Sequence, residues 1–414
     1  MGAVGPGAGP VCRGCGAVLR RTFVDLGPSP LCERFLAANE LDDMEPFYPL
    51  HVRICDACLL VQLPAYVPGE EIFSEYAYFS SYADSWVAHA AAYVALMVDR
   101  LALGPASRVV EIASNDGYLL QHVVARGIPA LGVESAANVA RAARARGVPT
   151  VEHFFGAAVA AALVADGGTA DLVVANNVLA HVPDIRDFTR GLAVLLAPGG
   201  TLTLEFPHLL RLIEGVQFDT IYHEHYSYLS LFTVGRLLRE QGLVMTDVEE
   251  LPTHGGSLRV HARHAAVAAP TPRVAAVAAA EAAFGLDGPD GYAGFGPRVE
   301  AVKRALLTFL IEARDAGKTV AGYGAPGKGN TLLNYCGIRG DLLAYTVDRN
   351  PYKHDRFLPG TRIPVFAPAR LAETRPDYIL ILPWNLRDEI AAQLAYTRDW
   401  GARFVVPIPT VEIF

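Results

Sequence analysis

The sequence predicts an α/β protein of three parts: an N-terminal zinc-binding module, a doubly wound Rossmann-like domain and a second Rossmann-like α/β domain. Two cysteine pairs lie before residue 65, and short β-branched segments alternate with helical ones from Ser107 onward. The same alternation starts again after residue 297. Because 414 residues exceed the size at which a single core stops growing, several domains are expected, and we place them at 1–65, 66–265 and 266–414.

Composition and charge narrow the class of protein. A net charge of -8 and a pI near 5.8 argue against nucleic-acid binding, which depends on basic residues that contact phosphates. The chain is 52% hydrophobic, but much of this is alanine in helical runs, and no stretch of about 18 strongly apolar residues predicts a membrane span. The N-terminus lacks the basic region and leucine-rich core of a secretory signal. We therefore expect a cytoplasmic protein without nucleic-acid or membrane partners.

The first part contains two CxxC pairs with the spacing of metal knuckles. They are separated by 39 residues, and each lies in a turn-like context, CRGCGA and CDAC. In a reducing compartment this arrangement favours tetrahedral zinc over disulfides. The alternatives are four unrelated buried thiols and, less favoured because no βαβ pattern surrounds either pair, a redox CxxC. The expected ligands are Cys12, Cys15, Cys55 and Cys58, whereas Cys32 and Cys336 are expected to be inert core thiols.

The elements of the second part follow in order along the chain. A loop running into an amphipathic helix is predicted for 70–103, and RVVEIAS then forms a strand that leads through the turn NDG into a helix. ALGVES is the next strand and NVARAARARG the next helix. Further strands are DLVVANNVLAHV, GGTLTLEFP and LRVHARH. The Ala- and Pro-rich residues 265–297 are expected to be a linker or connecting helix.

The turn after the first strand of this domain distinguishes between cofactors. A dinucleotide site would have GxGxxG there, but EIASNDGY contains one glycine, Gly117, which argues against a pyrophosphate site. Glu134 lies 17 residues past Gly117, at the end of the second strand, where a carboxylate accepts hydrogen bonds from a ribose diol. That position suits NAD and S-adenosylmethionine equally, so the turn decides in favour of S-adenosylmethionine.

Two later segments of this domain add candidates. Phe154 or Phe155 in EHFFG is available to an adenine face. VANNVLAHV brings Asn176, Asn177 and His181 to a strand end that faces the cleft. For His181 the alternative is a histidine at a helix start that is merely satisfied by backbone.

The third part repeats the strand, glycine turn and helix in GYGAPGKGNTLLNY. Its glycines allow the backbone to approach an anion, and Lys328 can neutralise one, although a simple tight turn is the alternative. It is not a P-loop, because Gly329 and Asn330 follow the GK in place of Ser or Thr. Arg349 and Lys353 add positive charge near the next strand end. The four glycines are Gly322, Gly324, Gly327 and Gly329.

The set of motifs resembles one enzyme family. Besides the CxxC pairs it includes YAYFSSYADSW, EIASNDGYLL, NNVLAHVPD, EFPHLLRLIEGVQFDTIYHEHYSYLS, GYGAPGKGNTLLNY, VDRNPYKHDRFLPGT and LPWNLRDEI. Together these are similar to the nucleotide-sugar C-methyltransferases of deoxysugar biosynthesis, nearly from end to end. The resemblance implies a zinc module, a class I methyltransferase domain that binds S-adenosylmethionine, and a C-terminal substrate domain. One departure is EIASNDG, where alanine and serine replace the glycines of many methyltransferases.

The resemblance also implies a substrate and a set of site residues. The substrate is a dTDP-linked 4-keto deoxysugar that a monomeric enzyme methylates at C-3, next to the ketone. The expected cofactor contacts are Ala113, Asn115, Asp116, Gly117, Glu134, Phe154 and Asn177. The expected substrate contacts are Tyr222, Tyr323, Lys328, Asn330, Arg349 and Lys353.

The chemistry of such a substrate explains the titratable stretch TIYHEHYSYLS at 220–230. A proton on carbon beside a ketone is weakly acidic, so the site needs a neutral base and a donor to the developing enolate oxygen. We expect His225 to be the base, Tyr222 the donor, and Glu224 a residue that positions a partner or contacts a sugar substituent. As matches to the family's active-site motifs, His181 and Tyr76 complete the wall. For His223, Tyr226 and Tyr228 we favour packing or solvent exposure.

Two other functions compete with this prediction. An NAD-linked sugar oxidoreductase would use the C-terminal glycine turn for the dinucleotide and Asp348 as the ribose acid. A binding protein with a zinc ribbon, such as an RNA-associated relative of methyltransferases, is disfavoured by the acidic balance of the chain.

Overall fold

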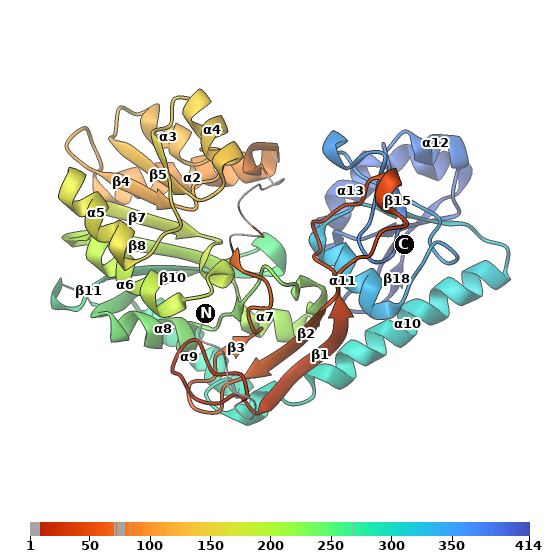
Figure 1. Cartoon of the computed structure of the whole chain (residues 1–414), viewed down its shortest axis with the longest axis horizontal. Helices are drawn as coiled ribbons and strands as arrows, with labels where there is room; N and C mark the ends of the chain where they lie inside the picture. The colour runs from red at the N-terminus through yellow and green to blue at the C-terminus, as the bar shows by residue number, and fades with distance from the viewer. Residues whose placement is uncertain (1–8, 70–71, 73–78, 83, 268) are drawn as a thin grey trace. The chain divides into compact units, whose positions relative to one another are not determined.

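The computed structural model describes residues 9–414 except 70–71, 73–78, 83 and 268 (Figure 1). The chain forms two compact units, and each unit is assembled from three segments. Unit 1 consists of Met1–Arg20, Ile54–Leu210 and Tyr226–Gly291. Unit 2 consists of Arg21–Arg53, Arg211–His225 and Tyr292–Phe414. The cysteine-containing N-terminal region therefore contributes to both units, and the predicted domain boundaries at 65 and 265 stay predictions.

Unit 1 is built on a seven-stranded sheet with the order β10-β11-β8-β7-β4-β5-β6 (Figure 1). The first five strands of the sheet along the chain are parallel to one another, whereas β11 is antiparallel to β8 and β10 is antiparallel to β11. The direction of strand addition reverses at β4, so the carboxyl ends of β4 and β7 form a topological switch point, where α/β sheets bind ligands. The strands are β4 (Val109–Ile112), β5 (Ala130–Glu134), β6 (Thr150–Glu152), β7 (Ala170–Asn176), β8 (Leu196–Pro207), β10 (Leu243–Leu251) and β11 (Ser257–His264).

Helices cover both faces of this sheet, because the central strands are apolar on both sides. In β7, Leu172 and Val174 pack with side chains of α2 and α3, whereas Val173 and Ala175 pack with those of α5, α6 and α8. The helices of unit 1 are α2 (Asp84–Leu101), α3 (Leu120–Val124), α4 (Ala137–Ala145), α5 (Ala157–Gly167), α6 (Ile185–Leu195), α8 (Leu231–Glu240) and α9 (Pro272–Phe284). The predicted doubly wound α/β fold is confirmed.

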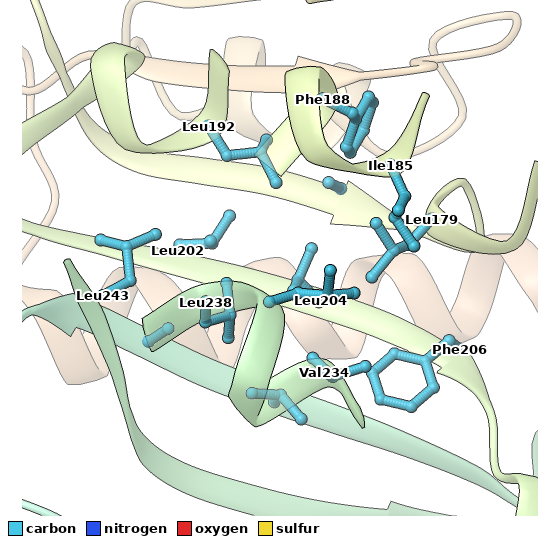
Figure 2. Packing of buried hydrophobic residues seen from close by; sticks show 14 of the residues in the cluster. Leu179, Ile185, Phe188, Leu192, Leu202, Leu204, Phe206, Val234, Leu238 and Leu243 are labelled. Carbon is cyan, nitrogen blue, oxygen red and sulfur yellow. The ribbon is translucent and has the colours of Figure 1, made fainter. Parts of the chain in front are cut away.

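Figure 2 shows how α6 and α8 pack on β8. Ile185, Phe188 and Leu192 recur at helical spacing and are buried, and the carboxylate of Asp184 accepts the N–H of Asp187 at 3.0 Å to cap the start of α6. Leu204 and Phe206 of β8 belong to the same cluster. Truncating one such leucine to alanine costs about 2–5 kcal/mol.

Unit 2 has its own seven-stranded sheet, with the order β14-β15-β13-β12-β16-β17-β18. Its five central strands are parallel, and Ala321, Ile379 and Phe404 of this sheet are fully buried. The strands are β12 (Val320–Tyr323), β13 (Thr346–Val347), β14 (Arg356–Phe357), β15 (Pro364–Phe366), β16 (Tyr378–Ile381), β17 (Arg403–Val406) and β18 (Glu412–Ile413). The helices are α10 (Phe295–Asp315), α11 (Gly327–Cys336), α12 (Arg370–Thr374) and α13 (Arg387–Gln393).

Short elements complete the two units. In unit 1, β3 (Val61–Gln62) pairs antiparallel with β9 (Ser227–Tyr228), and the 3-10 turn η3 (Leu179–His181) follows β7. β1 (Arg21–Ser29) and most of β2 (Tyr48–Ile54) belong to unit 2, where the ring of Phe23 stacks on Phe295 at 4.6 Å. The short helix α7 (Leu209–Glu214) contains the passage from unit 1 to unit 2. No helix in the described part of the chain has the length and apolarity that crossing a membrane requires.

Candidate functional site

The two cysteine knuckles meet in unit 1. The four Sγ atoms lie within 4.8 Å of one another, with 3.4 Å between Cys12 and Cys58 and 3.5 Å between Cys15 and Cys55. Tetrahedral zinc with Zn–S bonds of about 2.3 Å requires sulfur–sulfur distances of about 3.8 Å, so the cluster fits this ion. Four sulfur ligands leave no open position, and the zinc therefore supports the fold and does no chemistry.

The cofactor turn lies at the carboxyl end of β4. Ala113 and Asn115 adopt left-handed backbone conformations, with φ of 56° and 48°. The N–H of Asn115 donates to one carboxylate oxygen of Glu134 at 2.9 Å, and the N–H of Ala136 donates to the other at 2.9 Å. A carboxylate oxygen can accept more than one hydrogen bond, so a ribose hydroxyl is a suitable further donor to Glu134. Burial raises the pKa of Glu134, while the backbone hydrogen bonds oppose that effect.

The neighbouring end of β7 supplies unsatisfied polar groups. Asn177 has a φ of 54°, and its N–H donates to the carbonyl of Glu205 at 2.6 Å. Neither side-chain polar atom of Asn177 has a hydrogen-bond partner among the described residues, and the same holds for Oδ1 of Asn176. Buried polar atoms are normally paired, so these amides fit a ligand at the strand end. His181 is half-buried at the end of η3.

The other expected cofactor residues have different surroundings. Asp116 is fully buried, and its Oδ2 forms an ion pair with Arg146 at 2.5 Å and accepts the hydroxyl of Ser81 at 2.5 Å, whereas its Oδ1 has no hydrogen-bond partner among the described residues. Phe154 is 47% exposed. Phe155 instead packs edge-on against Phe188 at 5.4 Å and belongs to the core. Of the two phenylalanines, Phe154 is therefore the one available to a ligand.

A buried ionic network near this strand end was not predicted from the sequence. Glu205 of β8 is 1% exposed and accepts hydrogen bonds from Arg259 at 3.0 and 3.2 Å, and Nε2 of His89 lies 3.0 Å from the same carboxylate. The ring of Trp86 stacks on that of His89 at 5.0 Å. The available signal was a single charged residue within the apolar strand TLTLEFP.

The stretch 220–225 lies in unit 2, where a nearby backbone carbonyl orients the imidazole of His225. Nδ1 of His225 lies 2.7 Å from the carbonyl oxygen of Thr220. A carbonyl oxygen only accepts hydrogen bonds, so Nδ1 carries the proton and Nε2 is the basic nitrogen. The ring of Tyr222 lies 4.1 Å from the imidazole, tilted by 31°. Both side chains are half-buried.

Glu224 and His223 face other surroundings within unit 2. Glu224 is buried, with a carboxylate oxygen 3.8 Å from Sγ of Cys32. Burial and then the charges of Glu224 and Glu33 raise the pKa of the Cys32 thiol well above its ordinary value. His223 is buried against Tyr48, whose carbonyl lies 3.2 Å from Nε2, and burial lowers the pKa of His223 to about 4. Tyr76 lies outside the described residues.

The chain re-enters unit 1 at Tyr226. Tyr226 and Tyr228 are both buried there.

Most candidates in the C-terminal glycine turn have partners within unit 2. Lys328 donates to Oδ1 of Asn385 at 2.8 Å and lies 4.9 Å from the ring of Trp384. The indole N–H of Trp384 donates to Asp219 at 2.7 Å, and burial raises the pKa of Asp219 to about 6. Lys328 therefore lies in a polar cluster that joins the turn to Asp219, directly before the titratable stretch.

Of the four remaining expected substrate residues, three form hydrogen bonds within unit 2 and one is exposed. Asn330 donates to the carbonyl of Cys32 at 2.6 Å, and Lys353 donates to the carbonyl of Ala325 at 2.7 Å. The hydroxyl of Tyr323 donates to Gln393 at 3.2 Å. Arg349 is exposed.

Asp348, the acid on which the oxidoreductase alternative depends, already accepts backbone N–H groups on both oxygens. Ala325 donates to one at 2.7 Å and Asn350 to the other at 2.8 Å. The carboxylate therefore holds the glycine turn in place.

Three family models match successive parts of the chain. Residues 12–73 match the model described as "Putative zinc binding domain", 86–248 match "Methyltransferase domain", and 252–409 match "C-methyltransferase C-terminal domain". A curated relative, C-methyltransferase NovU of Streptomyces niveus, is 37% identical over 97% of this chain and 96% of its own length. The chain belongs to this C-methyltransferase family.

More distant matches cover only part of the C-methyltransferase. Ubiquinone biosynthesis O-methyltransferase of Burkholderia pseudomallei is 25% identical over 38% of this chain and 73% of its own length. The solved magnesium protoporphyrin IX methyltransferase of Synechocystis PCC 6803 has 17% identity and a TM-score of 0.35 over 43% of this chain and 83% of its own, too low to support an argument.

The family membership confirms the predicted enzyme class, a methyltransferase that uses S-adenosylmethionine, and the zinc-binding cysteine cluster. Nothing in these matches supports the oxidoreductase alternative.

Proposed function

We propose that this C-methyltransferase methylates C-3 of a dTDP-linked 4-keto deoxysugar. Methyl transfer to carbon requires a nucleophilic carbon, and a ketone provides one by acidifying the neighbouring C–H bond. S-adenosylmethionine supplies an electrophilic methyl group on sulfur. The protein must then remove a proton from C-3 and stabilise the enolate oxygen that forms.

His225 is the base in this proposal, and one observation carries the assignment. The carbonyl of Thr220 accepts from Nδ1 at 2.7 Å, which fixes the tautomer and leaves Nε2 as a neutral proton acceptor. Nε2 takes the C-3 proton, the electrons of that C–H bond move into an enolate, and the enolate carbon then forms the new C–C bond as the C–S bond breaks. The proton remains on the imidazole during methyl transfer and is then released to solvent.

Tyr222 is suited to donate to the developing enolate oxygen. Its ring lies beside that of His225, and both are half-buried, so a substrate carbonyl that reaches one residue also reaches the other. Glu224 positions a partner or contacts a substituent of the sugar, and the family resemblance assigns His181 and Tyr76 to the active site as well. On the cofactor side, the pairing of Glu134 and the unpaired amide of Asn177 support their assignment to S-adenosylmethionine.

The dTDP portion is assigned to the C-terminal α/β fold. Arg349, as an exposed guanidinium beside the end of β13, is suited to a diphosphate. Lys353 and Lys328 add positive charge, and Tyr323 and Asn330 contribute contacts around the same glycine turn.

The test is turnover of a dTDP-4-keto deoxysugar with S-adenosylmethionine, followed by mass spectrometry. Wild-type protein should yield a product heavier by one CH₂ group, and NMR should place the new methyl on C-3. His225→Asn keeps a similar size but no base, and should lower kcat at least about 100-fold while the affinity for S-adenosylhomocysteine changes little.

His51→Asn is a control for the loss of an imidazole. His51 bonds to Thr22 in β1 at 2.7 Å and has no role in the proposed chemistry, so kcat should stay within about twofold. Wild-type turnover by His225→Asn would remove its role as base, and methylation at oxygen or nitrogen would overturn the proposed substrate chemistry.

A further inference from the structure

Arg13 lies between the two cysteines of the first zinc knuckle, and its guanidinium contacts groups outside that knuckle. Its guanidinium donates to the carbonyl of Pro183 at 3.0 Å and to the carbonyl of Leu63. It also lies 5.2 Å from the centre of the ring of Tyr226. One side chain therefore contacts three segments of unit 1 that are distant in sequence.

These segments are already joined to one another at Tyr226, which is 1% exposed. The N–H of Tyr226 donates to the carbonyl of Ala180 at 2.8 Å, and its carbonyl accepts the N–H of Leu63 at 3.0 Å. Its hydroxyl donates to the carbonyl of Val67 at 3.1 Å. The guanidinium covers this junction, and its charge is attracted to the face of the Tyr226 ring.

The junction lies next in the chain to both histidines of the proposed site. Ala180 precedes His181, and Tyr226 follows His225, so the 2.8 Å hydrogen bond joins their chain neighbours. A shift of this bond is transmitted to each histidine through one peptide unit. Displacement of a catalytic group by about 1 Å costs on the order of 100-fold in rate.

The metal cluster fixes the backbone that carries Arg13. The side-chain oxygen of Gln62 accepts the N–H of Arg13 at 2.9 Å, and its amide N–H donates to Sγ of Cys12 at 3.0 Å. Four thiolates around Zn²⁺ carry a net charge of about -2, which the nearby guanidinium offsets. The knuckle thus holds the arginine through covalent geometry, a hydrogen bond and charge.

We propose that Arg13 is a positioning residue, through which the zinc knuckle holds the 180–183 segment and Tyr226 in place and so orients the histidines beside them. The inference rests on the proposed function for its consequence in catalysis. It gives the structural zinc a role in the reaction, although no step passes through the metal. The planar guanidinium of arginine can contact two carbonyls and an aromatic ring at once. The ammonium group of lysine can replace only some of these contacts.

The test compares Arg13→Gln and Arg13→Lys with a matched control, Arg236→Gln. Arg236 donates to the carbonyl of Ala57 in the second knuckle at 3.2 Å. Its substitution by glutamine, like that of Arg13, removes one positive charge near the cluster. Each protein is assayed for zinc content, for S-adenosylhomocysteine affinity by calorimetry, and for kcat and KM. Long-range ¹H–¹⁵N NMR of the imidazoles reports the surroundings of His181 and His225 without turnover.

Arg13→Gln should keep one zinc per chain and change the S-adenosylhomocysteine affinity less than about threefold, while kcat falls about 10- to 100-fold. Arg13→Lys should recover part of kcat, and Arg236→Gln should stay within about twofold of wild type. Both histidine resonances should shift in Arg13→Gln and not in Arg236→Gln.

Unshifted histidine resonances, or a loss of kcat in proportion to lost zinc, would overturn the positioning role. If wild-type protein does not methylate the sugar, the proposed function fails, and the imidazole spectra still decide the role of Arg13.

Discussion

Removing the buried carboxylate of Glu205 should destabilise unit 1 severely. In Glu205→Ala, Arg259 loses its two bonds at 3.0 and 3.2 Å and keeps Glu249, at 3.4 Å, as a charged partner, together with Nε2 of His89 at 3.1 Å. The guanidinium is almost fully buried, so its charge is left without adequate compensation. Loss of one partner of a buried ion pair costs about 3–5 kcal/mol, a large part of the ordinary stability of a domain.

The pKa of Glu205 indicates when this contribution is present. Burial tends to raise the pKa, but the hydrogen bond from His89 and the charge of Arg259 outweigh it, so the folded pKa lies below the ordinary value of 4.5. A carboxylate with a lowered pKa contributes stability above its unfolded pKa and loses it as the pH falls through the folded pKa. Measurements at pH 7 therefore report the whole effect.

The assay is thermal unfolding followed by circular dichroism, with tryptophan fluorescence as a second probe. A loss of 3–5 kcal/mol should lower the midpoint of the affected transition by roughly 10 °C. Glu300→Ala removes an exposed partner of Arg304, 3.5 Å away, and should change stability by less than about 0.5 kcal/mol. Glu205→Ala combined with Arg259→Met should recover more than half of the loss, because no buried charge remains. A cost below about 1 kcal/mol for Glu205→Ala would refute the reasoning.

Three further predictions concern the other parts of the protein. Burial lowers the pKa of His223 from 6.5 to about 4, so stability should fall by up to roughly 3 kcal/mol as the pH drops from about 6.5 to about 4, and His223→Gln should flatten that part of the stability profile. Glu134→Ala should weaken binding of S-adenosylhomocysteine at least about tenfold in calorimetry without sugar, and an unchanged affinity would contradict the ribose assignment. Chelation of zinc should lower the thermal midpoint, whereas a metal-free protein with an unchanged midpoint would show that the cysteines do not hold a structural ion.

Much of the fold could be predicted, because the spacing of cysteines and of apolar residues along the chain determines the local structure. The four cysteines were identified from spacing alone, and GGTLTLEFP does lie in β8. Of the predicted strand DLVVANNVLAHV, only the first half lies in β7, which ends at Asn176, and Leu179–His181 form η3 instead. The switch from period 2 to helical spacing is a property of adjacent residues, so it can be read without knowledge of the tertiary fold.

Contacts between distant segments could not be predicted in this way. The partners of Glu205 come from α2 and β11, 116 and 54 residues away along the chain, and no local pattern links them. The glycine turn predicts Lys328 as a candidate ligand for phosphate, and that role stays a prediction. The contacts of its ammonium group with Asn385 and Trp384 could not be predicted from the turn alone.

The tautomer of His225 also depends on the folded backbone. The sequence predicts an imidazole that titrates near neutral pH, but the carbonyl that selects its basic nitrogen belongs to Thr220, and only the turn of the chain brings the two within 2.7 Å.

The most direct test of carbon deprotonation is hydrogen exchange without methyl transfer. The protein is incubated in D₂O with the dTDP-4-keto deoxysugar and S-adenosylhomocysteine, and NMR follows deuterium incorporation at C-3. Wild-type protein should exchange the C-3 proton much faster than the uncatalysed reaction, and His225→Asn should not accelerate it. Exchange at the uncatalysed rate by wild-type protein, or equal acceleration by both proteins, would contradict a base at His225.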